Sequence, residues 1–163
     1  MIKFLISGVI FITLFFFPFN LYGKTLKLEI PQIVSMYTAV NEGNNIHWKG
    51  DTYPKTLCGI LWQETKAGYS KYRKNGYVLG DKDQSIGPMQ VQVRTARWIG
   101  EKYPNLFIYK FNKSVYDITD NEIKNALMKD EVWNIKVGAT YFSFLLEYMG
   151  DYNQAILAYN KGP

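Results

Sequence analysis

Cysteine and histidine are almost absent from this sequence. Its 163 residues include one cysteine, Cys58, and one histidine, His47. A single cysteine excludes an intrachain disulfide and a cysteine-based metal site, and a catalytic zinc normally takes three protein ligands. We therefore expect no metal centre and no cofactor. A nucleophilic pair of Cys58 and His47 stays open as an alternative, although Cys58 lies in an apolar helical pattern, where cysteine usually fills space in a core.

Acidic residues are outnumbered by basic ones. The chain has 14 Asp and Glu against 19 Lys and Arg, a formal net charge of +5, and 47% of its residues are apolar. This composition excludes a disordered tail and a collagen-like repeat, and the length suits one domain. The positive charge is modest and no nucleic-acid-binding motif is visible, so we expect no nucleic-acid partner.

A long run without charge occurs at the N-terminus. Residues 1–3 supply a positive start, residues 4–19 contain no charge, and residues 20–23 form a more polar exit that ends in Gly23. This organisation is typical of a secretory signal peptide over residues 1–23. An uncleaved anchor is the alternative, but the run is shorter than the roughly 20 residues of a spanning helix. We expect residues 24–163 to form an exported domain of the periplasm or cell envelope, which contacts the membrane only if the leader is uncleaved.

The rest of the chain predicts a mainly α domain of the α+β kind. Helices are expected over 31–40, 54–65, 92–99 (closed by Gly100), 119–128, 130–149 and 152–160. In the first of them, Ile33, Val34, Tyr37 and Val40 form one apolar stripe. Residues 43–52 are predicted to be a loop, and residues 77–86 a short hairpin within an irregular segment.

The position of Glu64 makes it the main candidate for a catalytic residue. Leu57, Ile60, Leu61 and Glu64 are spaced i, i+3, i+4 and i+7, so the carboxyl group lies on the apolar stripe of its helix. Burial there raises the pKa of a glutamate above about 4.3, which suits a general acid near neutral pH. The alternatives are a structural glutamate paired with Lys or Arg, and one turned to solvent at the helix end.

Four short motifs occur in an order that resembles a known family. They are Glu64-Thr65, Gly87-Pro88-Met89-Gln90-Val91, Asn134 with Gly138, and Ala158-Tyr159-Asn160-Lys161-Gly162-Pro163. Together they resemble the lytic transglycosylase domain related to goose-type lysozymes, over residues from about 54 to 163. The resemblance implies a lysozyme-like fold in which a short irregular or hairpin segment lines a glycan cleft.

The resemblance also implies roles for single residues. Glu64 matches the catalytic glutamate, and Thr65 stands where the family usually has serine. The Met-Gln turn lines the sugar cleft in the family, with Pro88 here in place of leucine, and the Tyr-Asn pair closes that cleft. The substrate-binding candidates are Thr65, Ser85, Met89, Gln90, Tyr159 and Asn160.

The implied activity is that of a peptidoglycan lytic transglycosylase. Glu64 would donate a proton to the glycosidic oxygen between N-acetylmuramic acid and N-acetylglucosamine. It would then take the proton of the muramyl 6-hydroxyl, which attacks to form a 1,6-anhydro ring. A lysozyme-like hydrolase is one alternative, with Asp81 and Asp83 as candidate second acids, although Gln92 stands where goose-type relatives often have an acid. A non-catalytic peptidoglycan-binding module is the other.

The expected partner is the glycan strand of peptidoglycan. Residues 66–82 are rich in Lys and Arg and include Tyr69, Tyr72 and Tyr77, so we expect them to flank the cleft and to attract carboxylates. A single small catalytic domain also resembles the transglycosylases that open gaps for secretion, pilus or conjugation machines. The family usually continues beyond the last motif, so an end at Pro163 indicates a minimal domain or a truncated one.

Overall fold

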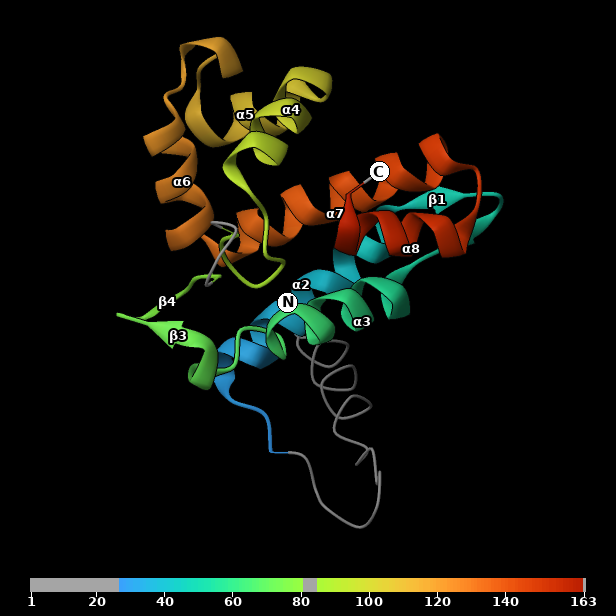
Figure 1. Cartoon of the computed structure of the whole chain (residues 1–163), viewed down its shortest axis with the longest axis horizontal. Helices are drawn as coiled ribbons and strands as arrows, with labels where there is room; N and C mark the ends of the chain where they lie inside the picture. Colours follow the sequence, from blue (N-terminus) through green and yellow to red (C-terminus); the bar gives the residue numbers. More distant parts are fainter. Residues whose placement is uncertain (1–26, 81–84, 163) are drawn as a thin grey trace, which may run out of the picture.

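This computed structural model describes residues 27–80 and 85–162, which contain seven α-helices, two small β-hairpins and two short 3-10 helices, η1 (Ser70–Tyr72) and η2 (Val115–Asp117) (Figure 1). The helices are α2 (Ile30–Asn45), α3 (Pro54–Thr65), α4 (Val93–Lys102), α5 (Pro104–Phe111), α6 (Asp120–Lys129), α7 (Glu131–Met149) and α8 (Tyr152–Lys161). The strands are β1 (His47–Trp48), β2 (Asp51–Thr52), β3 (Arg73–Lys74) and β4 (Tyr77–Val78), paired antiparallel as β1–β2 and β3–β4. The mainly α fold class is confirmed. The expected leader, residues 1–23, lies outside the described residues, as do the candidate acids Asp81 and Asp83.

Helix α7 runs through the middle of the molecule. It packs against α2, α4, α6 and α8, and Figure 1 shows α2 and α3 beneath it and α4, α5 and α6 gathered toward its N-terminal end. The side chain of Asp130 accepts a hydrogen bond from the Trp133 N–H and caps its start, and Gly150, with φ of 62°, ends it. Most of the middle of α7 is buried, including Val137, Phe142 and Leu145. The core of the domain therefore forms around this helix.

The predicted helix ends with clear local signals are confirmed. Helix α3 begins at Pro54 and ends at Thr65, as expected from a proline at its first position. Thr119 and Glu122 form the capping box at the start of α6, with the Glu122 N–H donating to Thr119 Oγ1 at 3.2 Å. Asp151 caps α8 by accepting from the Gln154 N–H at 2.8 Å. These ends depend on neighbours within three residues, so the sequence alone specifies them.

Three of the four residues of the apolar stripe predicted on the first helix face solvent, and the fourth, Val40, is partly buried. Ile33, Val34 and Tyr37 are 37%, 49% and 64% exposed, while the buried residues of α2 are small or polar, Gln32, Ser35, Thr38, Ala39 and Gly43. A Cβ atom at Gly43 would overlap the backbone of Pro54, so α2 approaches the start of α3 through its small side chains. That close approach turns the larger side chains outward.

Two further element predictions were wrong in part. Residues 43–52 are not one loop, because α2 continues to Asn45 and β1 and β2 form a hairpin. Gly100 does not close α4, which runs on to Lys102; the ring of Phe107 lies 2.7 Å from where a Cβ of Gly100 would stand. Phe107 belongs to α5, a helix that the sequence reading missed although Pro104 is a usual first residue.

The irregular segment between α3 and α4 contains two β-hairpins, whereas one was predicted. The expected hairpin over 77–86 is present as two backbone hydrogen bonds, from the Gly80 N–H to Ser85 O at 2.7 Å and from the Gly87 N–H to Val78 O at 2.8 Å. A second hairpin, β3–β4, precedes it around Asn75 and Gly76, which have φ of 52° and 82°. Asn-Gly is a common signal for such a turn.

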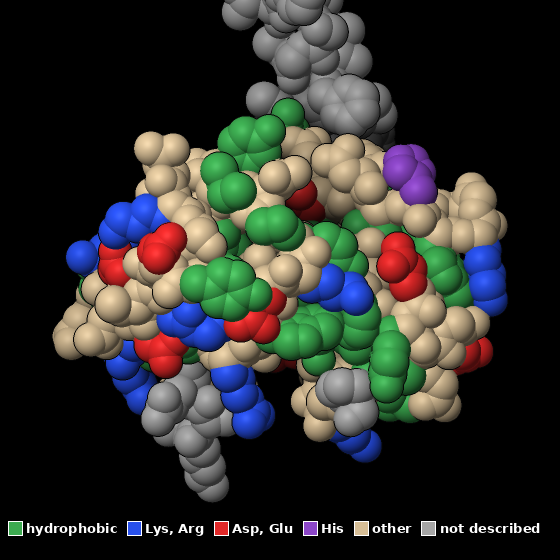
Figure 2. All heavy atoms as spheres, turned by 90° about the horizontal axis from the view of Figure 1, so that it is seen from above, with side chains coloured by type: hydrophobic (Ala, Val, Ile, Leu, Met, Phe, Trp, Pro, Cys, Tyr) green, Lys and Arg blue, Asp and Glu red, His purple; other side chains and the backbone are tan. Residues whose placement is uncertain are grey.

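Three further features concern the surface, the helices and the acidic side chains of the described residues. Apolar side chains gather across the middle of the face in Figure 2, with charged ones mostly around them. Within residues 27–80 and 85–162, none of the helices has the length and apolar character needed to span a bilayer. The same residues hold no cluster of three His, Cys, Asp or Glu side chains suited to a metal ion.

Gly100 in α4 and Gly59 in α3 make a matched test of this packing. Gly100→Ala is expected to destabilise the protein by about 1–3 kcal/mol, because its methyl group must displace the Phe107 ring. Gly59→Ala, in α3 with open space around it, should stabilise by about 0.5–1 kcal/mol through helix propensity. Urea unfolding followed by circular dichroism measures both, and equal midpoints for the two variants would contradict the packing of α4 on α5.

Candidate active site

A cleft of about 820 Å³ brings most of the predicted site residues together. Its lining comes from the end of α3, the segment between β4 and α4, and helices α4, α7 and α8. The lining residues are Glu64, Ser85, Gln90, Val91, Gln92, Arg94, Thr95, Trp98, Tyr141, Phe144, Tyr148, Tyr159, Asn160, Lys161 and Gly162. Five of the sequence-based candidates are in this set: Glu64, Ser85, Gln90, Tyr159 and Asn160.

Glu64 lies at the last turn of α3, where the apolar stripe meets the cleft. Leu57, Ile60 and Leu61 are at most 6% exposed, and Glu64, next on the same stripe, is partly buried and lines the cleft. The stripe that the sequence predicted is therefore real. It directs this carboxyl group to the junction between the core and the cleft.

The Tyr159 side chain lies within the electrostatic reach of Glu64. Burial, and then the negative charges of Glu64 and Tyr141, hold the pKa of Tyr159 well above its ordinary value. The hydroxyl donates a hydrogen bond to the Met89 carbonyl oxygen at 3.1 Å. Tyr159 therefore stays a neutral phenol and joins α8 to the segment that contains Met89.

The segment 86–91 forms a tight turn that presents Gln90. Ile86 and Val91 exchange two backbone hydrogen bonds of 2.9 and 3.0 Å, and the Gln90 N–H donates to Gly87 O at 3.0 Å. Gly87 and Gln90 both have positive φ, 74° and 49°. The Gln90 side chain also donates to Gly87 O at 2.9 Å, so this turn fixes the side chain that lines the cleft.

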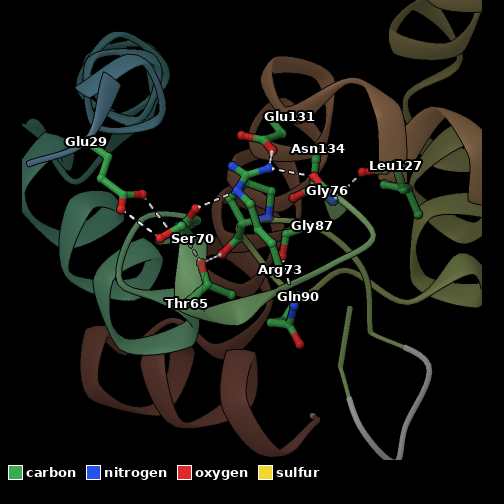
Figure 3. A network of polar contacts seen from close by, with 12 residues as sticks. Glu29, Thr65, Ser70, Arg73, Gly76, Gly87, Gln90, Leu127, Glu131 and Asn134 are labelled. Carbon is green, nitrogen blue, oxygen red and sulfur yellow. Dashed lines mark hydrogen bonds and ion pairs between the residues drawn. The ribbon is translucent and has the colours of Figure 1, made fainter. Parts of the chain in front are cut away.

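Asn134 of α7 holds this turn by hydrogen bonds to its backbone (Figure 3). Its Oδ1 accepts from the Met89 N–H at 3.0 Å, and its Nδ2 donates to Ile86 O at 2.8 Å and to Leu127 O at 3.3 Å. The side chain is fully buried, and a Cβ at Gly87 would overlap it. Gly87 is thus required both by its positive φ and by its contact with Asn134.

Gly138, one helical turn after Asn134, completes the contact between α7 and the site. A Cβ atom here would stand 2.8 Å from Met89 Cβ and 2.8 Å from Tyr159 Oη. Only a residue without a side chain lets the α7 backbone approach both. This spacing explains why asparagine and glycine occur four residues apart in this helix.

Thr65 joins the end of α3 to the same turn. Its Oγ1 donates to Pro88 O at 2.8 Å and accepts from the Gly68 N–H at 2.9 Å. Thr65 is 2% exposed and Met89 is fully buried, and neither lines the cleft. Of the expected substrate-binding residues, these two therefore lie beneath the lining and support it.

An aromatic wall on α4 and α7 was missed by the sequence reading. Trp98 packs edge-on against Phe144 with ring centres 4.6 Å apart, and Phe144 stacks with Tyr148 at 5.3 Å. Tyr141 lies 5.5 Å from the Tyr159 ring and continues the wall toward Glu64. The spacing of 141, 144 and 148 was visible as helical periodicity, but periodicity does not separate a partly exposed wall from a buried stripe.

The basic and tyrosine-rich flank predicted over residues 66–82 does not line the cleft within its described part, residues 66–80. Tyr69, Tyr72 and Tyr77 are absent from its lining, and Arg73 instead pairs with Glu131, Nη1 to Oε1 at 2.5 Å. Among the described residues, the cations that line the cleft are Arg94 and Lys161. Helix α4 and the end of α8 therefore supply positive charge that the sequence predicted for this flank.

The alternative nucleophile pair has no support in the geometry. Cys58 is partly buried, its thiol points to Met36 O at 3.8 Å, and burial raises its pKa to about 11. Such a thiol stays protonated at neutral pH. Neither Cys58 nor His47 lines the cleft that holds Glu64.

Asn134→Ala tests the clamp under the turn. The variant leaves the Met89 N–H and the Ile86 carbonyl buried without this partner, so we expect a loss of about 2–4 kcal/mol in unfolding free energy. Asn125→Ala, at an exposed position of α6, is the matched control and should change it by less than about 0.5 kcal/mol. Chemical denaturation compares the two, and equal effects would show that the clamp does not support the turn.

Comparison with known proteins agrees with this geometry. The family model described as the transglycosylase SLT domain matches residues 42–163, which include the four motifs and every residue that lines the cleft. No curated protein and no solved structure was found to match the chain. The chain belongs to the transglycosylase SLT domain family.

Proposed function

We propose that this chain is a peptidoglycan lytic transglycosylase. It would cleave the β-1,4 bond between N-acetylmuramic acid and N-acetylglucosamine and leave a 1,6-anhydro-muramyl end. The observation that carries the proposal is Glu64, a partly buried carboxyl at the end of an apolar helix stripe, lining the cleft of a transglycosylase SLT domain.

One residue acts twice in the proposed reaction. Protonated Glu64 gives its proton to the glycosidic oxygen as the bond from that oxygen to the muramyl anomeric carbon breaks. The acetamido oxygen of the substrate supports the positive charge on that carbon, as in substrate-assisted glycosidases. The muramyl 6-oxygen then bonds to the anomeric carbon, and its proton returns to Glu64. Atoms and charge balance without water.

The walls of the cleft suit a sugar polymer with acidic substituents. Trp98, Phe144 and Tyr148 offer flat apolar faces against which sugar rings stack. Arg94 and Lys161 line the same cleft and would attract the carboxylates of lactyl groups and stem peptides. Apolar faces together with cations favour peptidoglycan over a neutral polysaccharide.

Gln92 favours transglycosylation over hydrolysis. It lines the cleft at the position where goose-type relatives often have an acid, and its Oε1 accepts a hydrogen bond from Arg94 Nε at 2.6 Å. An amide engaged in this way does not activate a water as a carboxylate does. The hydrolase remains the alternative that product analysis decides.

Export and a partner machine are part of the same proposal. The leader-like residues 1–23 would take the chain to the periplasm or cell envelope, where peptidoglycan lies. There the domain would open local gaps for a secretion, pilus or conjugation machine, as the transglycosylases that it resembles do.

Glu64→Gln tests the catalytic assignment. Wild-type protein is expected to release anhydromuropeptides from purified sacculi, and the variant should lose at least a hundredfold in rate, because the amide cannot donate and then accept the proton. Glu42→Gln is the matched control. Like Glu64, Glu42 is a partly buried glutamate. Burial raises the pKa of Glu42, but Glu42 lies outside the cleft lining, so its variant should keep full activity.

The products separate the candidate functions. Mass spectrometry distinguishes anhydro ends from reducing ends on the released fragments. Reducing ends from the wild type would identify a hydrolase. Tight binding to sacculi with no product from either protein would identify a binding module and would overturn the proposal.

Trp98→Ala tests the aromatic wall. Trp98 is 38% exposed and faces the cleft, so its loss should weaken the binding of a glycan fragment about tenfold, or about 1.4 kcal/mol. Tyr109→Ala is the control, since Tyr109 is 90% exposed and does not line the cleft. Titration calorimetry with a peptidoglycan tetrasaccharide measures both, and equal affinities for the two variants would contradict this role of the wall.

A further inference from the structure

We propose that Glu29 and Gln32 are positioning residues for Glu64. Both lie upstream of residue 42, where the family match begins, and so outside the domain that the family defines. They would act by holding a left-handed turn that directly follows Glu64 and Thr65. This inference rests on the proposed function for its kinetic readout, and its structural readout is independent of that function.

The backbone after Glu64 adopts an unfavourable conformation. Lys66, Ala67 and Gly68 have φ of 52°, 59° and 75°, three consecutive left-handed residues of which two are not glycine. Residues with a side chain rarely adopt this conformation, because Cβ approaches the following carbonyl oxygen. Such a segment persists only where surrounding contacts fix it, and these segments are frequent at functional sites. This turn is therefore the part of the Glu64 surroundings that most needs external support.

Gln32 supplies that support from α2. Its Nε2 donates to the Lys66 carbonyl oxygen at 2.8 Å, and its Oε1 accepts from the Glu29 N–H at 2.9 Å. Gln32 is 3% exposed. Both ends of the amide are used, so its orientation is fixed and the donor stays directed at the first left-handed residue.

Glu29 holds the far side of the same turn. Its carboxylate accepts from the Ser70 N–H at 3.0 Å and from Ser70 Oγ at 2.7 Å, and Figure 3 shows Glu29 reaching across to Ser70. Residues 66–70 are thus tied at both ends to one turn of α2. The Thr65 bond to Pro88 O holds the same region from the other side.

The segment that directly follows Glu64 is therefore held by two sets of contacts of different origin. The Thr65–Pro88 bond and the Asn134 clamp belong to the matched domain, whereas the contacts of Glu29 and Gln32 come from a part of α2 that the family model does not include. Loss of the α2 contacts would let the turn relax and would move the last turn of α3, which carries the acid. A displacement of about 1 Å at a reacting group can lower a rate by up to a hundredfold.

The test compares Gln32→Met with Ser35→Ala. Methionine keeps the volume of Gln32 but removes its donor and acceptor. Ser35 is buried on the same face of α2, and its hydroxyl has no hydrogen-bond partner among the described residues, which makes it a matched control. We expect Gln32→Met to lower kcat on sacculi ten- to hundredfold with KM within twofold of wild type, and Ser35→Ala to change neither.

A second substitution separates positioning from general loss of stability. Lys66→Gly places a glycine, which adopts positive φ without penalty, at the first left-handed residue. In the double variant Gln32→Met/Lys66→Gly the turn needs less support, so kcat should recover at least threefold over Gln32→Met. Lys66 does not line the cleft, and Lys66→Gly alone should stay near wild-type activity.

Hydrogen exchange gives the structural readout. Amides of residues 66–70 should exchange at least tenfold faster in Gln32→Met than in wild type or Ser35→Ala, while those of α7 stay unchanged. Unchanged exchange at 66–70, or a kcat that falls only with the unfolded fraction, would overturn the proposal. If the wild type releases no product, the proposed function fails and exchange still decides whether Gln32 holds the turn.

Discussion

The hydrogen bond from Thr65 Oγ1 to Pro88 O joins the two turns on which the site depends. One turn follows the helix that carries Glu64, and the other presents Gln90. Both contain left-handed residues with side chains, each of which costs about 1–2 kcal/mol relative to ordinary backbone. Neither turn would hold its shape alone. Together they form one buried polar layer, and the lining of the cleft is built on it.

This layer explains several residue choices that seem unrelated along the chain. Gly87 must be glycine because Asn134 occupies the space of its Cβ, and Gly138 because Met89 and Tyr159 lie against the helix backbone. A buried amide that makes three hydrogen bonds is costly to remove, since its partners would remain unsatisfied. The motifs are therefore parts of one contact network that connects α3, α7 and α8.

The sequence could predict what depends on near neighbours. The ends of α3, α6 and α8 follow from a proline, a capping box and a capping aspartate, each within a few residues of the helix end. The burial of α2 could not be predicted in this way, because Gly43 selects the packed face through contact with Pro54, eleven residues on. The same holds for Gly100, whose partner Phe107 belongs to the next helix.

In the candidate site, too, some residues could be predicted from local sequence patterns, whereas the roles of others depend on tertiary contacts. Periodicity placed Glu64 on an inward stripe, and the motifs indicated Gln90, Tyr159 and Asn160, all of which line the cleft. The support from Thr65 and the wall around Trp98 depend on contacts across the fold. A hydroxyl that lines a cleft and one that ties two turns together look alike in a sequence, so only tertiary structure separates their roles.

The charged side chains of the cleft bear on the choice between transglycosylation and hydrolysis. Among the described residues that line it, Glu64 is the single carboxylate and Arg94 and Lys161 are the cations. Tyr159 is kept neutral by burial and by the charge of Glu64. A two-carboxylate hydrolase uses a second acid to activate water or to attack the sugar. With Gln92 bound to Arg94, the described part of this lining offers one carboxyl group, Glu64, that can give a proton and later receive one. Transglycosylation needs no more than that, because the nucleophile is a hydroxyl of the substrate itself.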